Sequence, residues 1–127
     1  MKLEPDCVRA ILLTVEENTS YQSLLSFEEA TLPDFPRLTE YPLDEVLYHL
    51  KKCNEAGLLC GAQFFYDSAN VEGLHFRGHE FLENIRDDSR WHSVKKGLEA
   101  IRNYSLPAIA SIAESVAATA ISGFISG

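Results

Sequence analysis

The sequence predicts an α+β fold, a small domain followed by a helical extension, on the basis of three observations. Apolar residues recur at helical spacing in two segments of the first half of the chain. An apolar, aromatic-rich run in the middle of the chain is followed by a turn and a short alternating segment, as in a β-hairpin. The 127 residues, 46% hydrophobic and 24% charged, have the composition of one globular domain and are too few for a multidomain enzyme.

The first helix is expected over residues 5–17. Pro5 suits a first helical turn, where an amide hydrogen would have no partner. The apolar residues at i, i+3, i+4 and i+7 are Val8, Ile11, Leu12 and Val15. Residues 18–20 end this helix.

Residues 21–42 carry the weakest pattern in the chain. Leu24, Leu25 and Phe27 suit a short strand, and residues 28–30 a single helical turn. The prolines that exclude a long regular element here are Pro33, Pro36 and Pro42.

A second helix is expected over residues 43–56. Asp44 and Glu45 lie in its first turn and Lys51 and Lys52 near its end, as the helix dipole favours. Gly57 then suits a left-handed cap, with apolar Leu58 beyond it.

A β-hairpin is expected next. Residues 58–66 form its first strand, residues 67–70 the turn, and residues 74–76 the returning strand. Gly78 is expected to break the strand before a helix over residues 80–88.

The end of the chain is predicted to be helical. Trp91, Val94, Leu98 and Ile101 are spaced three, four and three apart, like one seam of a coiled coil. Ser105 suits the N-cap of a last helix. From residue 106 onward, Glu114 is the only charged side chain.

This order of elements is that of a winged-helix domain, and the chain resembles bacterial winged-helix proteins. Residues 48–52 with 55–59 resemble the third helix and first wing strand, and residues 74–82 the second wing strand entering the next helix. The pieces 1–7, 16–19, 48–59 and 78–88 more narrowly resemble an uncharacterised family, a domain of unknown function, of small winged-helix proteins from bacteria and their phages. The resemblance implies a winged-helix domain at residues 1–90, followed by a helical extension at residues 91–127. It assigns no catalytic residues, because none is established for that family.

The charge distribution argues against a basic nucleic-acid binder. The chain holds 11 Lys and Arg against 19 Asp and Glu, a formal net charge of −8. Residues 1–90 hold eight of the basic and 17 of the acidic side chains, whereas the last 37 residues are nearly neutral.

In a helix-turn-helix protein the second helix of the motif enters the major groove of DNA. That helix is residues 43–56 here. The candidate nucleic-acid contacts are Tyr48, His49, Lys51, Lys52 and Arg77. Asp44 and Glu45 oppose this reading, because they would meet phosphates. The alternative is that Tyr48 and His49 are packing residues and the lysines are merely solvated.

Two functions therefore stay open at this point. One is a small regulatory protein that binds DNA. The other is an adaptor that docks onto a protein partner without contacting DNA, which the acidity favours.

Enzymatic, cofactor and metal chemistry is not predicted. His75 and His79 are four residues apart, but Gly78 between them argues against a shared helical face. The sequence contains no glycine-rich phosphate loop. Its three cysteines form no C-x-x-C pair, which with the acidic N-terminus predicts a cytoplasmic protein without a secretory signal. Cys7 and Cys53 fall near apolar helix faces and are expected to be buried, inert thiols.

The uncharged end of the chain allows three readings: a helix that joins two copies into a homo-oligomer, a helix that completes the chain's own core, or, least favoured, a membrane-inserted helix. Its hydroxyl side chains recur at helical spacing opposite an apolar face. The candidate oligomer-interface residues are Trp91, Val94, Leu98, Ile101, Ile109, Ile112, Val116, Ile121 and Phe124.

Overall fold

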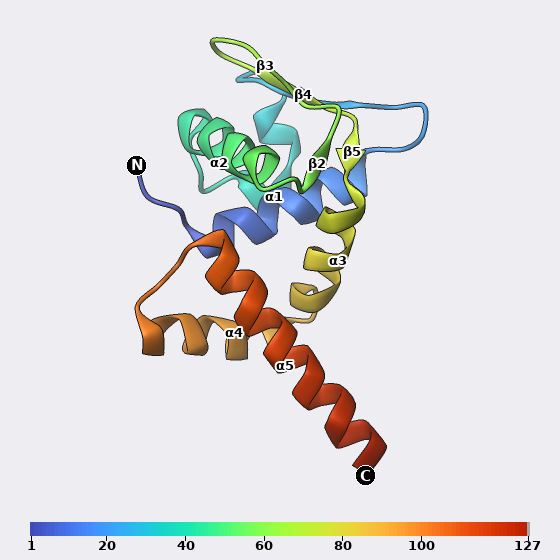
Figure 1. Cartoon of the computed structure of the whole chain (residues 1–127). Coiled ribbons are helices and arrows are strands. Elements are labelled where there is room, and N and C mark those ends of the chain that lie inside the picture. The colour runs from blue at the N-terminus through green and yellow to red at the C-terminus, as the bar shows by residue number, and fades with distance from the viewer. Residues whose placement is uncertain (127) are drawn as a thin grey trace. The chain divides into compact units, whose positions relative to one another are not determined.

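The computed structural model describes the backbone of residues 1–126 and the side chains of residues 1–123. The chain combines helices with short antiparallel strands (Figure 1), which confirms the α+β class. Contacts within the chain group into unit 1, Met1–His79, and unit 2, Glu80–Gly127. This division falls earlier than residue 90, inside helix α3 (Phe76–Ile85).

Two helices form the centre of unit 1. Helices α1 (Pro5–Asn18) and α2 (Leu43–Glu55) begin where the sequence predicts and pack against each other. The apolar side chains of these helices that are completely buried are Cys7, Val8, Ile11, Leu12, Val15, Val46, Leu50 and Cys53. They include all four apolar residues of the predicted stripe on the first helix.

The proline-rich segment between these helices contains three short elements. Strand β1 (Leu25–Phe27) confirms the predicted strand, and the amide of Leu32 donates to the carbonyl of Glu28 at 2.9 Å, which closes a single turn. Two 3₁₀ helices follow, η1 (Leu32–Asp34) and η2 (Pro36–Leu38). Each carries a proline in its first turn, where the missing amide hydrogen costs nothing.

The hairpin consists of four short strands, β2 (Leu59–Cys60), β3 (Gln63–Phe64), β4 (Ala69–Val71) and β5 (Gly73–Leu74). The β2–β5 and β3–β4 pairs share one register and are therefore two stretches of the same hairpin. Strand β1 pairs with β4 on the side away from β3, so the sheet order is β1–β4–β3.

The predicted turn at residues 67–70 is wrong by two residues. The amide of Phe65 donates to the carbonyl of Ser68 at 2.9 Å, so the turn spans residues 65–68. Asn70 already pairs with Gln63 and with Ser26, and this pairing on both sides of β4 fixes the register. Figure 1 shows the β3–β4 end of the hairpin extending away from α1 and α2.

Gly78 does not separate the returning strand from the next helix as expected, because α3 already begins at Phe76. A Cβ atom on Gly78 would overlap the carbonyl oxygen of Leu58 and lie 3.0 Å from its carbonyl carbon. Glycine is therefore needed here because a helix passes directly over the backbone at the start of the hairpin.

Unit 2 contains helices α4 (Asp88–Ile101) and α5 (Leu106–Ser126), which pack against each other. Asp87 caps α4 by accepting the amide of Arg90 at 2.9 Å. Ser105 caps α5 as predicted, since its Oγ accepts the amide of Ala108 at 3.2 Å. The buried side chains of the two helices are Trp91, Val94, Leu98, Ala108, Ile109, Ala113 and Ala117.

This burial corrects part of the predicted oligomer interface. Four of the candidates are buried within the chain itself: Trp91, Val94, Leu98 and Ile109. The apolar seam of α4 is covered in the molecule, where α5 packs on α4. Of the other candidates, Ile112 and Val116 are partly buried and Ile101 and Ile121 are exposed, whereas the side chain of Phe124 lies outside the described residues. The first part of α5 thus behaves as a core-completing helix.

Replacing Ile109 by alanine is expected to lower the free energy of unfolding by about 2–4 kcal/mol, since its side chain is completely buried. The matched variant Ile121→Ala, on the same helix but 61% exposed, is expected to change it by less than about 0.5 kcal/mol. Urea denaturation of both variants measures the difference. Equal losses at the two positions would contradict the burial of α5 on α4.

Helix α5 is also long and apolar enough, over Leu106–Gly123, to cross a membrane by length and composition alone. A core helix of a water-soluble protein passes the same test. About a fifth of this stretch (22%) is buried within the molecule.

Candidate functional site

The outer face of α2 carries charges of both signs. Asp44, Lys51 and Glu55 are exposed there, and Glu45 and Lys52 are partly exposed. The ammonium group of Lys52 lies 3.2 Å from a carboxylate oxygen of Glu55. With three acidic and two basic side chains, and one lysine already paired, α2 offers little positive charge to a ligand.

Tyr48 and Lys52 form a small cluster on this face. Tyr48 is partly exposed, and the Lys52 ammonium group lies 5.5 Å from the centroid of its ring, within the range of a cation–π contact. Lys51 points to solvent beside them.

His49 does not belong to the outer face, and the expectation that it contacts nucleic acid is wrong. Its side chain is completely buried. Its Nε2 accepts the amide of Glu4 at 2.8 Å, and its Nδ1 lies 2.7 Å from the carbonyl oxygen of Glu45. An Nε2 that accepts leaves the proton on Nδ1, so the ring is neutral and donates to Glu45. His49 thus ties the start of the chain to α2, as in the packing alternative.

Arg77 lies beside the end of α2. Its guanidinium group approaches Gly57, whose φ of +78° ends α2 in the left-handed conformation predicted for the cap. The amide of Leu58 donates to the carbonyl of Cys53 at 3.0 Å, which completes this cap. A cation at this position is favoured by the negative end of the helix dipole.

The whole of unit 1 is acidic. It holds six basic and 13 acidic side chains, whereas unit 2 holds five and six. The hairpin adds Asp67 and Glu72, both exposed, to the acidic side chains of α2. A formal charge of −7 on unit 1 repels polyanions and attracts cationic surfaces.

The tip of the hairpin presents two aromatic side chains, which the sequence reasoning missed because they continued an apolar run assigned to a strand. Phe65 is 56% exposed and Tyr66 is fully exposed. The sequence does contain a signal for their position. Asp67 and Ser68, two residue types common in turns, directly follow the aromatic pair and place it in the loop. Aromatic side chains held out from a folded module are frequent anchors of protein–protein contacts.

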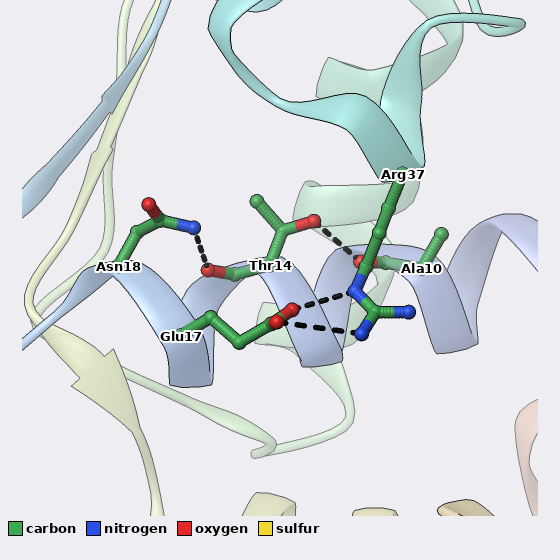
Figure 2. Close-up of polar contacts among 5 residues, drawn as sticks. All are labelled: Ala10, Thr14, Glu17, Asn18 and Arg37. Carbon is green, nitrogen blue, oxygen red and sulfur yellow. Dashed lines mark hydrogen bonds and ion pairs between the residues drawn. The ribbon is translucent and has the colours of Figure 1, made fainter.

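A cleft of about 520 Å³, most of whose lining residues are polar, lies between the end of α1 and the 3₁₀ helices. Figure 2 shows Arg37 reaching Glu17 with two hydrogen bonds, while Thr14 donates to Ala10 and Asn18 to the carbonyl of Thr14. The Arg37–Glu17 pair joins η2 to α1, and both side chains are close to half exposed. An exposed ion pair of this kind contributes at most about 1 kcal/mol to stability.

The paired histidines of the sequence are not brought into a ligand set. His75 and His79 are both exposed, and His75 Nδ1 accepts the amide of Arg77 at 3.1 Å. Within the part of the chain that the structure describes, no group of three His, Cys, Asp or Glu side chains gathers as a metal ion would require.

Cys7 and Cys53 are buried as predicted, and Cys60 is exposed. Burial raises the pKa of the Cys53 thiol to about 12, with the nearby Cys7 adding to the effect. Burial and then the carboxylates of Glu45, Glu4 and Glu40 raise the pKa of the Cys7 thiol to about 12. Both thiols therefore stay protonated and unreactive at neutral pH.

At pH 8, a thiol-specific reagent is expected to modify Cys60 at once and Cys7 and Cys53 only on unfolding. The pKa of both buried thiols is raised from the ordinary value of 9.0 to about 12 in the folded state. The stability that they contribute is therefore complete below pH 9 and declines as the pH rises toward 12, because the unfolded chain loses these protons first. Mass spectrometry of the labelled protein and denaturation at rising pH measure the two effects. Labelling of all three thiols at the same rate in the folded protein would contradict this burial.

Comparison with known proteins places this chain in a family. A family model described as "Hypothetical protein (DUF2513)" matches residues 2–104. A Haemophilus influenzae protein described as "Uncharacterized protein" is 33% identical over 122 residues, which cover 91% of this chain and 95% of that protein. No solved structure matches the chain significantly. The chain therefore belongs to the family described as "Hypothetical protein (DUF2513)".

Proposed function

We propose that unit 1 is a winged-helix docking module, part of a small non-enzymatic regulatory or adaptor protein of bacterial or phage origin that acts in the cytoplasm. Its ligand is a protein with a basic surface. The single observation that carries this proposal is the acidity of the outer face of α2 and of the hairpin. In a DNA-binding winged-helix protein these two elements would instead carry basic side chains.

The order of elements supports the winged-helix interpretation. A helix, a short strand, a compact 3₁₀ segment, a second long helix and a hairpin follow each other. Strand β1 pairs with the returning strand of the hairpin, which gives the order β1–β4–β3. In this interpretation α2 is the recognition helix and residues 65–68 form the tip of the wing.

The charge on these two parts favours protein over DNA. A specific protein–DNA complex depends on several Lys or Arg side chains that contact phosphates. Asp44 and Glu45 occupy the first turn of α2, where the recognition helix of a helix-turn-helix protein approaches the bases. Lys52 is already paired with Glu55. A basic protein surface would instead be attracted by these same carboxylates.

The wing supplies the apolar part of the proposed contact. Phe65 and Tyr66 bring large side chains, the first 56% exposed and the second fully exposed, and Asp67 follows them directly. An aromatic anchor beside an acidic rim matches a partner pocket that is apolar inside and basic at its edge.

Site-specific photo-crosslinking tests this proposal. A photoreactive phenylalanine analogue at Tyr66 is expected to form one discrete protein adduct in native cells, which Asp44→Lys/Glu45→Lys abolishes. The matched control position is Tyr21, which is equally exposed (104% against 103%) but lies before β1. Adducts of equal yield at both positions, or adducts that survive the charge reversal, would refute docking through the wing and α2.

DNA binding is the second candidate function, because exposed Lys51 lies in sequence beside Lys52 and Arg77 lies at the end of the same helix. In this candidate Tyr48, Lys51, Lys52 and Arg77 contact phosphates. His49 has no part in it, since both of its ring nitrogens are used inside the molecule.

A further inference from the structure

A second surface of unit 1 combines an apolar groove with acidic surroundings. The groove measures about 490 Å³ and lies where the 3₁₀ helices meet the start of α2. Its apolar lining comes from Leu32, Pro33, Leu38, Pro42 and Leu43. This volume lies within the range of about 300–1,000 Å³ typical of ligand-binding clefts.

The groove is held in shape by its backbone. Leu38 at its base is completely buried. The amide of Leu38 donates to the carbonyl of Phe35 at 3.0 Å, and the amide of Tyr41 donates to the carbonyl of Leu38 at 3.1 Å. Two of the lining residues are prolines, whose fixed φ limits rearrangement of the walls. A preformed groove loses little conformational entropy when a ligand enters.

The charges around the groove are negative. Glu29 lines it directly, and the exposed side chains of Glu28, Glu40 and Asp44 lie next to lining residues along the chain. None of the residues that line it is basic. Arg37, the one basic residue of the sequence between residues 28 and 44, is ion-paired with Glu17.

From this combination we infer that the groove binds an extended peptide segment of a partner, with one or two aliphatic side chains inserted between the prolines and with Lys or Arg on either side. The inference rests on the proposed function in one respect, that unit 1 binds protein. It concerns a surface separate from the wing tip and names the chemistry of the segment bound there.

Peptide titration of the ¹⁵N-labelled full-length chain tests the inference. The probes are the acetylated hexapeptides Lys-Arg-Leu-Leu-Lys-Arg, Lys-Arg-Ser-Ser-Lys-Arg and Glu-Asp-Leu-Leu-Glu-Asp. The Leu-containing basic peptide is expected to shift the amide resonances of Leu32, Thr39 and Leu43 in a saturable way. The other two peptides are expected to bind at least tenfold more weakly.

Two variants with the same change of charge separate the groove from the wing. Glu29→Lys is expected to weaken binding of the Leu-containing basic peptide at least fivefold, whereas Asp67→Lys at the wing tip changes it by less than twofold. Unchanged amide spectra elsewhere show that both variants are folded. Absent shifts, equal binding of the Ser-containing peptide, or equal effects of the two variants would each overturn the inference. Crosslinking at Tyr66 in the chain with Asp44 and Glu45 unchanged does not depend on Glu29, so failure of the groove and failure of the wing are distinguishable.

Discussion

Replacing Gly78 by alanine is expected to destabilise the protein by about 3 kcal/mol, although alanine is the better helix former by about 1 kcal/mol. The added Cβ would overlap the carbonyl oxygen of Leu58. The Cβ atom is fixed rigidly to the backbone of α3 and the oxygen belongs to the backbone of Leu58, so relief requires α3 to move away from the start of the hairpin. Urea denaturation followed by circular dichroism measures the loss.

Two other glycines provide matched controls for this change. A Cβ on Gly97 would lie 2.9 Å from Cγ2 of Ile112, a side-chain methyl group rather than a backbone atom, so Gly97→Ala is expected to cost less than Gly78→Ala. A Cβ on Gly123 would have nothing within 4 Å, so Gly123→Ala is expected to be neutral or stabilising by up to about 1 kcal/mol. A Gly78→Ala protein as stable as the parent would show that α3 does not pass over Leu58.

The variant His49→Ala is expected to lose about 2–4 kcal/mol of stability. The change removes a completely buried ring and its hydrogen bonds to Glu4 and Glu45, and it leaves a cavity under α2. Tyr48→Ala, at the adjacent and partly exposed position, is expected to cost less than about 1 kcal/mol. Thermal denaturation of both variants compares them. A stable His49→Ala protein would contradict the buried role of this side chain.

The helices of unit 1 could be predicted because their signals are local. The stripe of Val8, Ile11, Leu12 and Val15 and the cap at Gly57 depend on spacing and backbone conformation within a few residues. The same is true of the Ser105 cap, whose hydrogen bond spans three residues.

Features that depend on contacts distant in the sequence could not be predicted in the same way. His49 is polar and lies beside exposed lysines in the sequence, yet its partner Glu4 lies 45 residues away. A glycine after a strand is typical of a break between two elements. Gly78 instead lies within α3, where the carbonyl group of Leu58 leaves no room for a side chain. The seam from Trp91 to Leu98 has the spacing of an intermolecular coiled coil, and only the structure shows that α5 of the same chain packs on α4.

The candidate site shows the same division. The acidity of α2 follows from the sequence, whereas only the structure shows that Lys51 and Arg77 are exposed and Lys52 is partly exposed. The exposure of Phe65 and Tyr66 depends on a turn two residues earlier than predicted, which the pairing of β4 with both neighbouring strands determines. The apolar groove beside α2 is built by 3₁₀ helices from a segment without sequence periodicity.

The central claim is the proposal that unit 1 is a winged-helix module that docks onto protein rather than DNA. It is tested most directly by titrating the full chain into a fluorescent duplex of random sequence at low salt. Low ionic strength maximises any contribution from phosphate contacts. We expect no change in fluorescence anisotropy at micromolar protein for the parent or for Lys51→Ala/Lys52→Ala. A saturable increase for the parent that added salt or Lys51→Ala/Lys52→Ala abolishes would contradict the claim and assign α2 to DNA.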